Sequence, residues 1–405
     1  MTTVELQTTA MAVGGEAIAR EDSGRVVFVA GALPGETVTA ELLDEKASFA
    51  RAAVVDVVAA APERVAPPCP HVAEGCGGCD WQHIEVEHQR ELRQGIVADV
   101  LARNGKVVDP QVRPGTPLAA EHLRTTVRGV ADAEGRFSFR RRRSHDLVAV
   151  DHCLVAHPAV DDIIARGSFP PGAEVVIRVG ARTGERSVLV GPSSRGTTVP
   201  DDVVVVDEKE LEGGHRSWIH EEVAGRTWRV SARSFFQASP EGAEALVDAV
   251  DGFIAEHAPD AERLVDLCCG VGLFAGTSGG GRSVVGVERS ASSVADARRN
   301  LGDVDARIVK VALARWRPSP ADVVVADPAR SGLGKEGVAA VVGTGAPLCV
   351  LVSCDPAALG RDAGLLAAAG YVHVGSVVVD LFGHSSHIEV VSGFTKPVEV
   401  GRGGG

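Results

Sequence analysis

The sequence predicts a multidomain protein with an N-terminal OB-like β-barrel, a central α+β region that carries a cysteine cluster, and a C-terminal Rossmann-like α/β domain. Three observations support this prediction. The chain has 405 residues, which is more than one ordinary hydrophobic core accommodates. Short strand-like runs separated by turns fill residues 1–60. From Pro240 onward, apolar strands alternate with helical segments, which is typical of a doubly wound sheet.

Residues 1–60 are predicted to form the barrel. Four β-like runs occur there, with the sequences VELQTTAMAV, RVVFVAGAL, ETVTAELLD and FARAAVVDVV. Turn-forming residues lie between them, at positions 14–15, 22–24 and 34–35. Strands this short, at this spacing, favour a small barrel.

Residues 61–232 are predicted to form the central region. A segment rich in proline, glycine and cysteine opens it. A helix is expected from about Glu85 to Arg103, because apolar residues recur there with helical spacing. From about residue 124 to residue 230 short strands return, which predicts an antiparallel α+β arrangement.

Residues 233–400 are predicted to form the Rossmann-like domain. In open parallel sheets, ligands bind at the carboxyl ends of the strands. Three predicted strand ends carry candidate functional residues: the run DLCCGVGLF at 266–274, Asp327 in ADVVVADPAR, and Cys354 in LVSCDPAALGRD. A thiol at a strand end is well placed to act as a nucleophile. A free cysteine is also a common small core residue, but the neighbouring motifs and Glu389 favour a functional role.

The DLCCGVGLF turn predicts a cofactor pocket. Gly270 and Gly272 follow a strand directly, which lets the backbone approach a ligand closely at the start of a helix. The dinucleotide fingerprint G-x-G-x-x-G is matched only with Ala275 in its last position, and such matches are weak. An S-adenosyl-L-methionine pocket fits better, with Glu288 at the end of the next strand bonding the ribose hydroxyls. The alternative for Glu288 is an ordinary surface charge.

Four of the eight cysteines lie in polar or Gly/Pro-rich surroundings. They are Cys69, Cys76, Cys79 and Cys153. Their spacing is C-x6-C-x2-C followed by a distant fourth cysteine. Four thiolates suit either zinc or a [4Fe–4S] cluster, and the spacing alone does not decide between them.

The net charge of −13 argues against a general nucleic-acid coat. A local basic segment nevertheless stands out, with seven arginines and two acidic residues between Arg124 and Arg143. Five of these arginines form the candidate RNA-binding set: Arg136, Arg140, Arg141, Arg142 and Arg143. Such a run can be a solvated strand, but in an acidic protein its density favours contact with phosphate.

The sequence predicts no membrane segment and no secretory signal. Charges interrupt every apolar run before it could span a bilayer. The N-terminus lacks a basic region followed by an apolar core. We therefore expect a cytoplasmic protein, in which structural disulfides are rare.

Four motifs together resemble the S-adenosyl-L-methionine-dependent RNA uracil-C5 methyltransferases, which form 5-methyluridine in ribosomal and transfer RNA. The motifs DLCCGVGLF, DPARSGL, LVSCDPAALGRD and FGHSSHIEVV occur in this order and spacing. The N-terminal sequences GGEAIAR, RVVFVAGALPGETV and FARAAVVDVV resemble the TRAM domain of that family. The resemblance covers nearly the whole chain.

The resemblance implies a role for each candidate residue. Cys354 would add to C6 of the target uracil, and Glu389 would remove the C5 proton after methyl transfer. The implied cofactor-binding set is Gln237, Cys268, Gly270, Gly272, Leu273, Glu288 and Asp327. Cys69, Cys76, Cys79 and Cys153 match the iron–sulfur ligands of the cluster-bearing members, which favours a [4Fe–4S] cluster over zinc.

The chain departs from the family pattern at three cofactor positions. Family members commonly have an aromatic residue in place of Cys268, Asn in place of Leu273, and an acidic or amide residue near Ala312. The TRAM domain and the cluster favour 23S ribosomal RNA as substrate, and we expect a monomer. The alternatives are the same chemistry on tRNA, or a non-catalytic iron–sulfur protein that binds RNA.

Overall fold

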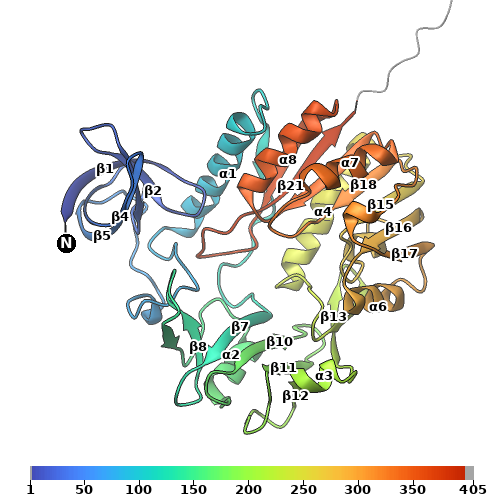
Figure 1. Ribbon diagram of the computed structural model, residues 1–405, viewed down its shortest axis with the longest axis horizontal. Helices are drawn as coiled ribbons and strands as arrows, with labels where there is room; N and C mark the ends of the chain where they lie inside the picture. Colours follow the sequence, from blue (N-terminus) through green and yellow to red (C-terminus); the bar gives the residue numbers. More distant parts are fainter. Residues whose placement is uncertain (1, 397–405) are drawn as a thin grey trace, which may run out of the picture.

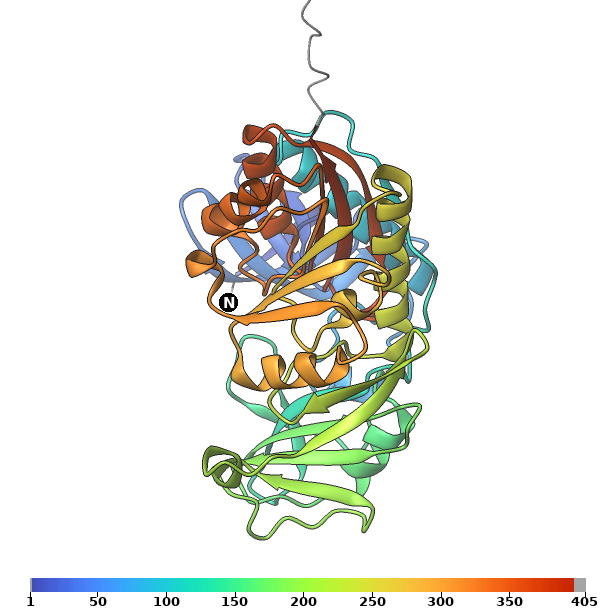
Figure 2. The ribbon, with the colours of Figure 1, turned by 90° about the vertical axis from the view of Figure 1, so that its right-hand side faces the viewer.

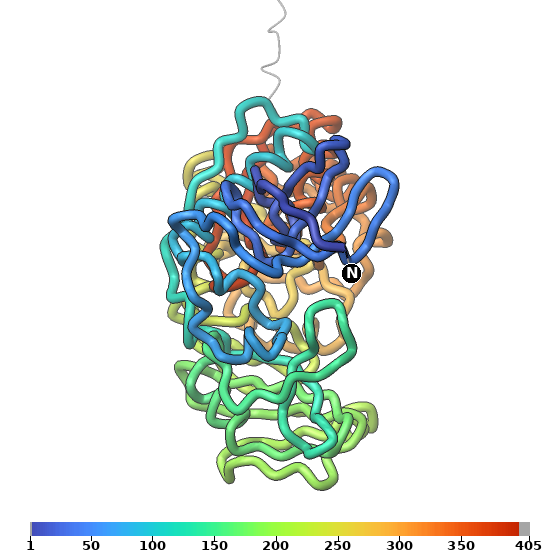
Figure 3. The backbone as a smooth tube through the Cα atoms, turned by 90° about the vertical axis from the view of Figure 1, so that its left-hand side faces the viewer, coloured from blue at the N-terminus to red at the C-terminus, as the bar shows by residue number. Residues whose placement is uncertain are grey.

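The computed structural model describes residues 2–396, which form three parts (Figure 1). An N-terminal barrel lies at one side, a central sheet lies at the bottom of the view, and an α/β domain occupies the other side. Seen from the barrel side, the barrel stands in front of the α/β domain and the central strands form the lower end (Figure 3). Within residues 2–396, no helix is both long and apolar enough to cross a membrane.

The barrel confirms the fold predicted for the N-terminal segment. Its five strands are β1 (Thr3–Met11), β2 (Ala17–Arg20), β3 (Val26–Ala30), β4 (Thr37–Glu45) and β5 (Phe49–Ala59). They close in the order β1-β2-β3-β5-β4, with β3 and β5 parallel and the other neighbours antiparallel. Inward side chains such as Val27, Val29 and Val38 are fully buried, whereas the residues between them are more exposed, as the period of a strand requires.

The central part is a six-stranded sheet with short helices. The strands follow the order β12-β11-β10-β7-β8-β9, and all neighbours except β11 and β12 are antiparallel. Its elements are β7 (Thr126–Ala131), β8 (Phe137–Arg140), β9 (Leu147–Ala149), α2 (Pro158–Arg166), β10 (Glu174–Val179), β11 (Arg186–Gly191), β12 (Val203–Asp207) and α3 (Glu208–Glu212). A separate hairpin, β13 (Trp218–Val223) and β14 (Arg226–Ser231), leads to the C-terminal domain.

The C-terminal domain is built on an eight-stranded sheet. Its own strands are β15 (Arg263–Leu267), β16 (Ser283–Glu288), β17 (Ala306–Lys310), β18 (Val323–Ala326), β19 (Leu348–Ser353), β20 (Val372–Val379) and β21 (Glu389–Thr395). The order is β17-β16-β15-β18-β19-β21-β20-β6, with the first five strands parallel. β21 runs antiparallel to both of its neighbours. This order confirms the predicted Rossmann-like class.

Helices cover both faces of this sheet (Figure 2). They are α4 (Pro240–His257), the short α5 (Leu273–Gly276), α6 (Ala291–Asn300), α7 (Gly334–Thr344) and α8 (Pro356–Ala368). Two one-turn segments lie outside this set: η1 (Pro70–Val72), in the cysteine-rich stretch after the barrel, and η2 (Leu313–Arg315). α7 and α8 share one apolar cluster with the sheet, and α4 and α6 share another with the β13–β14 hairpin. The two clusters make this part the largest core of the protein.

Residues 86–114 pack on the C-terminal domain, whereas the sequence pattern assigns them to the central region of residues 61–232. α1 (Val86–Arg103) packs against α8, and β6 (Val112–Pro114) is the eighth strand of the C-terminal sheet, beside β20. A three-residue strand paired with a partner far along the chain leaves no local signal in the sequence. The predicted end of the C-terminal domain, residue 400, lies outside the described residues.

A buried ion pair ties the barrel to the segment that follows it. Glu36 is fully buried, and it accepts hydrogen bonds from the backbone N–H groups of Leu33 at 2.8 Å and Ala61 at 3.2 Å. The guanidinium of Arg64 donates to both of its carboxylate oxygens, at 2.5 and 2.7 Å. Burial would raise the pKa of Glu36, but these donors outweigh it and lower the pKa below 4.5.

Replacement of Glu36 by Gln is expected to destabilise the barrel by about 2–3 kcal/mol, because Arg64 loses its charged acceptor. The loss should be measured at pH 7 as faster hydrogen exchange of barrel amides in the full chain. A folded-state pKa below 4.5 means that this contribution is complete above pH 4.5 and is lost as pH falls through the lowered value. The two proteins should therefore converge in acid. The exposed Glu5→Gln is the control, and equal exchange of Glu36→Gln and wild type at pH 7 would contradict the assignment.

Candidate active site and cysteine-lined cavity

Three candidate residues meet at one edge of the C-terminal sheet. Asp327 directly follows β18, Cys354 directly follows β19, and Glu389 is the first residue of β21. These three strands are neighbours in the sheet. Because β21 is antiparallel to β19, with Val390 opposite Ser353, Glu389 comes to the end of the sheet where Cys354 lies. The sequence pattern predicted that Asp327 and Cys354 lie at strand ends. The reversed direction of β21 brings Glu389 to the same edge.

A helix cap fixes the backbone beside Cys354. Asp355 is the N-cap residue of α8, and its carboxylate accepts a hydrogen bond from the N–H of Ala358 at 2.7 Å. Pro356 occupies the first turn, where its missing N–H costs nothing. The strand therefore ends sharply at Cys354, which is half-buried at the junction.

The Cys354 thiol lies in surroundings that disfavour its anion. Burial raises the pKa of Cys354 to about 11, the carboxylates of Glu389 and Asp327 act in the same direction, and Arg330 opposes them. The thiolate is the reactive form of cysteine. A reaction at Cys354 therefore needs a proton acceptor close by, and the two carboxyl groups are candidates for that role.

Glu389 and Asp327 behave as a coupled pair of acids. Glu389 is 4% exposed, and burial together with Asp327 raises its pKa well above the ordinary value of 4.5. Burial raises the pKa of Asp327 to about 7. A buried and a half-buried carboxyl group whose charges interact do not both ionise readily at neutral pH. Acids with such raised pKa values are suited to proton transfer near neutrality.

Gln237 also reaches this edge. Its side chain is 7% exposed, and its amide nitrogen lies 3.5 Å from a carboxylate oxygen of Asp327. The Gln237 side chain thus faces the acid at the end of β18.

A buried polar network holds the loop that leads to Gln237. Asp296 on α6 is fully buried and accepts hydrogen bonds from the N–H and hydroxyl of Ser231 and the hydroxyl of Ser234. Arg178 on β10 donates to the carbonyl oxygens of the same two residues, at 3.0 and 2.9 Å. Burial lowers the pKa of Arg178 to about 10. Sequence analysis did not predict this network, because its members come from three distant segments.

The glycine-rich turn offers a place for a ligand between β15 and α5. Gly270 has a φ of 55°, and no atom lies within 4 Å of the position that a Cβ would take there. Glu288, at the end of β16, accepts hydrogen bonds from the N–H of Gly270 at 3.1 Å and the N–H of Ser290 at 2.6 Å. Gly272 has a φ of 96° and lies against Leu301. An open backbone turn beside a fixed carboxylate fits a ligand with ribose hydroxyls.

Cys268 and Leu273, the two residues of this turn that depart from the family pattern, have side chains in different surroundings. Cys268 takes a φ of 62°, which is uncommon for a residue with a side chain, and it is half-buried. Leu273 is 6% exposed and its side chain belongs to the apolar cluster under α4 and α6. Its side chain therefore supports the core, and only its backbone is available to a cofactor.

The four cysteines predicted to bind metal line one cavity. Cys69, Cys76, Cys79 and Cys153 surround a volume of about 290 Å³ between the segment after the barrel and the central sheet. Arg124 and His387 also line it. Burial raises the pKa of Cys153 to about 11, and it raises the pKa values of Cys76 and Cys79.

The four thiols do not form a compact group. A tetrahedral zinc with Zn–S bonds of about 2.3 Å brings its sulfurs to roughly 3.8 Å from one another. Within residues 2–396, the only three metal-binding side chains whose ligand atoms lie within 4.8 Å of one another are His71, Asp151 and His152. No three of the four cysteine sulfurs therefore lie that close together.

The candidate RNA-binding arginines make contacts within the protein. Arg136 pairs with Asp132 and Glu134, Arg140 with Glu174, Arg142 with Asp80, and Arg143 with Glu16. Arg141 forms an isolated β-bridge with Cys76. Arg136, Arg140 and Arg143 are at least half exposed. The pairs Arg136–Glu134 and Arg140–Glu174 join exposed side chains and contribute little to stability, so phosphate can replace these two carboxylates, whereas Glu16, the partner of Arg143, is buried. The pairs of Arg142 and Arg143 join the turn between β8 and β9 to residues 69–81, which we call the cysteine segment, and to the barrel.

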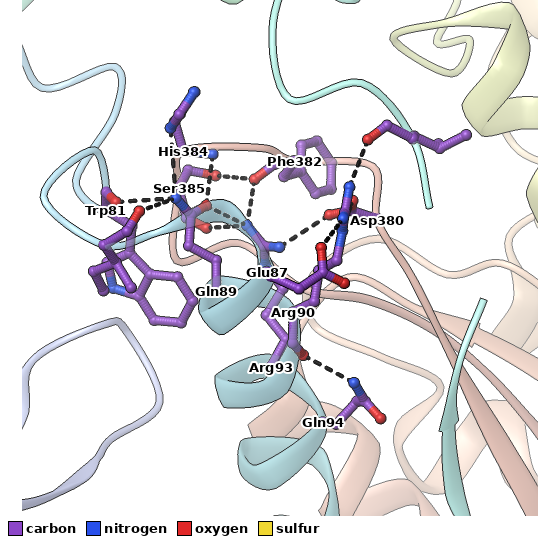
Figure 4. Close-up of polar contacts among 12 residues, drawn as sticks. Trp81, Glu87, Gln89, Arg90, Arg93, Gln94, Asp380, Phe382, His384 and Ser385 are labelled. Atoms are coloured by element: carbon purple, nitrogen blue, oxygen red, sulfur yellow. Dashed lines mark hydrogen bonds and ion pairs between the residues drawn. The ribbon is translucent and has the colours of Figure 1, made fainter. Parts of the chain in front are cut away.

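A second buried network lies between α1 and the segment before Glu389 (Figure 4). Gln89 is fully buried and Arg93 is 1% exposed, and both contact residues 380–385. Sequence reasoning missed them. The available signal is that these two polar residues share one helix face with the buried Ile96, Val97 and Val100.

Comparisons with known proteins agree with this architecture. The sequence profile of the TRAM domain matches residues 3–55. A protein of Streptomyces avermitilis named "Uncharacterized RNA methyltransferase" is 35% identical, over 96% of this chain and 97% of its own. The 23S rRNA (uracil(1939)-C(5))-methyltransferase RlmD of Halomonas elongata is 33% identical, over 95% of this chain and 88% of its own.

The fold is also found in a solved structure. The Pyrococcus abyssi tRNA (uracil-54, C5)-methyltransferase, in complex with S-adenosyl-L-homocysteine, has a TM-score of 0.73 and 20% sequence identity. The match covers 96% of this chain and 99% of that one. The relatives and the TRAM match together span nearly the whole chain, and the chain therefore belongs to the RNA uracil-C5 methyltransferase family with an N-terminal TRAM domain.

Proposed function

We propose that this methyltransferase forms 5-methyluridine through a covalent bond between Cys354 and C6 of the target uracil, with Glu389 as the base. The observation that supports the proposal most directly is the meeting of Cys354, Asp327 and Glu389 at one edge of the sheet. Family membership supplies the reaction class, and this geometry supplies a nucleophile and acids within the same site.

The residue types suit the chemistry. Uracil C5 is a poor nucleophile, and addition of the Cys354 thiolate to C6 turns the ring into an enolate that is nucleophilic at C5. When bound, S-adenosyl-L-methionine supplies an electrophilic methyl group on a sulfonium. The carboxylate of Glu389 then takes the C5 proton. The C–H electron pair forms the C5–C6 double bond, and the C6–S pair returns to Cys354.

The turn after β15 is the proposed cofactor site. Gly270, Glu288 and Gln237 are the residues whose positions best fit this role, since Gly270 faces open space and Glu288 is oriented by two N–H groups. Asp327 lies between this turn and Cys354 in the sheet order, which suits contact with both cofactor and base. Cys268, Gly272 and the backbone of Leu273 complete the proposed set.

The cysteine-lined cavity is the proposed site of a [4Fe–4S] cluster, with zinc as the alternative. Four thiolates are the usual ligands of such a cluster. Support comes from the volume of about 290 Å³ and from the four thiols that line it. A centre here would tie the segment of residues 69–79 to the loop before Cys153.

Large-subunit ribosomal RNA is the proposed substrate, and the cytoplasm the proposed location. The relative from Halomonas elongata named for 23S rRNA is 33% identical, whereas the Pyrococcus abyssi structure named for tRNA is 20% identical. Extrusion of the target base costs least in loops or single strands, and phosphate contacts by the exposed arginines of residues 136–143 would offset that cost. Mass-spectrometric mapping of 5-methyluridine in RNA from a deletion strain tests this, because a loss confined to tRNA would overturn the assignment.

Cys354→Ala is expected to lower methylation by more than about a thousandfold while leaving cofactor binding intact, because the thiol acts on the base alone. With RNA that contains 5-fluorouridine, the wild type should form a denaturation-resistant adduct, since fluorine cannot leave C5 as a proton. Cys349→Ala removes a fully buried thiol from the same strand and is the control that should still form the adduct. An adduct on the Cys354→Ala protein would refute the nucleophile.

Glu389→Gln is expected to slow release of product by about a hundredfold to ten-thousandfold, because the C5 proton loses its acceptor. Methyl transfer should still occur, so a methylated covalent protein–RNA complex should accumulate on normal RNA and be visible on a denaturing gel. Glu336→Gln changes an exposed glutamate on α7 and should behave as wild type. If Glu389→Gln binds RNA and cofactor normally yet traps no complex, another group is the base.

Cys153→Ser should abolish the brown colour of protein purified without oxygen, which should otherwise hold about four irons and four sulfides per chain. Stability should also fall, because Cys153 would close a long loop back to Cys69, Cys76 and Cys79. Cofactor affinity measured by calorimetry should change little, since Gly270 and Glu288 belong to another core. Cys349→Ala is again the control. One zinc and no iron in the wild type would exclude the cluster and leave the methyltransferase assignment untouched.

A further inference from the structure

The segment between β20 and β21, residues 380–388, ends directly at Glu389. Arg93 on α1 reaches three points of this segment (Figure 4). Its guanidinium donates to the Asp380 carboxylate at 3.0 Å, the Phe382 carbonyl oxygen at 2.8 Å and the Ser385 carbonyl oxygen at 2.9 Å. The same guanidinium lies over the ring of Trp81, with its carbon 5.5 Å from the ring centroid. Arg93 thus holds three points of the segment, and Arg90 on the same helix also donates to the Asp380 carboxylate, at 2.6 Å.

Neighbouring contacts hold the rest of the segment. The N–H of His384 donates to the Gln89 side-chain carbonyl at 2.9 Å, and the Gln89 amide donates back to the carbonyl oxygens of Trp81 and Ile84. The N–H and hydroxyl of Ser386 both donate to Asp80, at 2.7 Å. Residues 380–386 are therefore fixed by polar contacts from α1 and from the cysteine segment.

Burial of the charged Arg93 guanidinium costs free energy, which indicates a role beyond stability. Arg93 is 1% exposed, and burial lowers its pKa to about 10, so it stays a cation in the interior at neutral pH. Well-packed apolar residues often stabilise a core as well as a buried ion pair does. What an apolar side chain could not do is bond to two carbonyl oxygens and a carboxylate at once. The guanidinium fork fixes the shape of the loop.

We infer that Arg93 is a positioning residue for proton removal, which it controls through residues 380–388 and the Glu389 carboxylate. The inference rests on the proposed function, in which Glu389 takes the C5 proton. Proton removal at C5 depends directly on where the carboxylate lies, whereas methyl transfer uses Cys354, which follows β19, and the turn after β15. A shift of the segment should therefore slow one step selectively.

The test separates methyl transfer from proton release. RNA labelled with tritium at uracil C5 reports proton loss, and labelled methyl groups on the denatured protein–RNA complex report transfer without release. Arg93→Lys keeps the charge but loses the fork. We expect it to slow tritium release by about tenfold to a hundredfold, the effect of a small displacement of a catalytic group, and to accumulate methylated complex. Its KM values for RNA and cofactor should match those of the wild type.

A control variant and a second test variant accompany Arg93→Lys. Arg64→Lys alters another arginine paired with a buried carboxylate, whose side chain bonds Glu36 and the Gly31 carbonyl oxygen, and it should lower the melting temperature without accumulating complex. Asp380→Asn, which removes one charge and keeps the shape, is the second variant should Arg93→Lys fail to fold, and a smaller accumulation is expected. Tritium release and methyl transfer that fall together in the folded variant would overturn the inference. Absence of trapped complex in Glu389→Gln would instead overturn the proposed base.

Discussion

The antiparallel pairing of β21 with β19 is the constraint on which the candidate site depends. A strand that ran parallel to β19 would deliver its first residue to the opposite edge of the sheet. Because β21 is reversed, its first residue, Glu389, lies at the carboxyl edge beside Cys354. The pairing also explains why the preceding segment must be held in place. A residue at the start of a strand takes its position partly from the loop before it.

Buried charges join the parts of the protein around this edge. Arg93 connects α1 with the segment before Glu389, Arg178 connects the central sheet with the loop before Gln237, and Arg64 connects the barrel with the segment after it. Each arginine binds backbone carbonyls or a buried carboxylate from another part of the chain. Apolar contacts hold each core together, but they are less directional. Fixed hydrogen bonds from a planar guanidinium define how one part sits on the next.

The features of the fold that depend on short-range sequence periodicity were predicted from the sequence. The barrel strands, the alternation after Pro240, and the strand ends at Cys354 and Asp327 all follow from short-range periodicity. The place of β6 in the C-terminal sheet, the partners of Arg142 and Arg143, and the network of Asp296 could not be predicted, because each depends on segments far apart in sequence. The arginine run illustrates the limit: its composition indicates charge, but only the fold supplies its partners.

The cysteine segment has a structural position that its spacing alone did not indicate. Asp80, next to Cys79, bonds Ser386, and His387 lines the cavity that the four cysteines surround. The same short stretch of chain, residues 386–389, therefore runs from the cavity wall to the candidate base. The indole N–H of Trp81 also donates to the Gly15 carbonyl oxygen in the barrel, at 3.2 Å. Any centre that orders residues 69–79 would thus act on the barrel, on α1 and on the approach to Glu389 together.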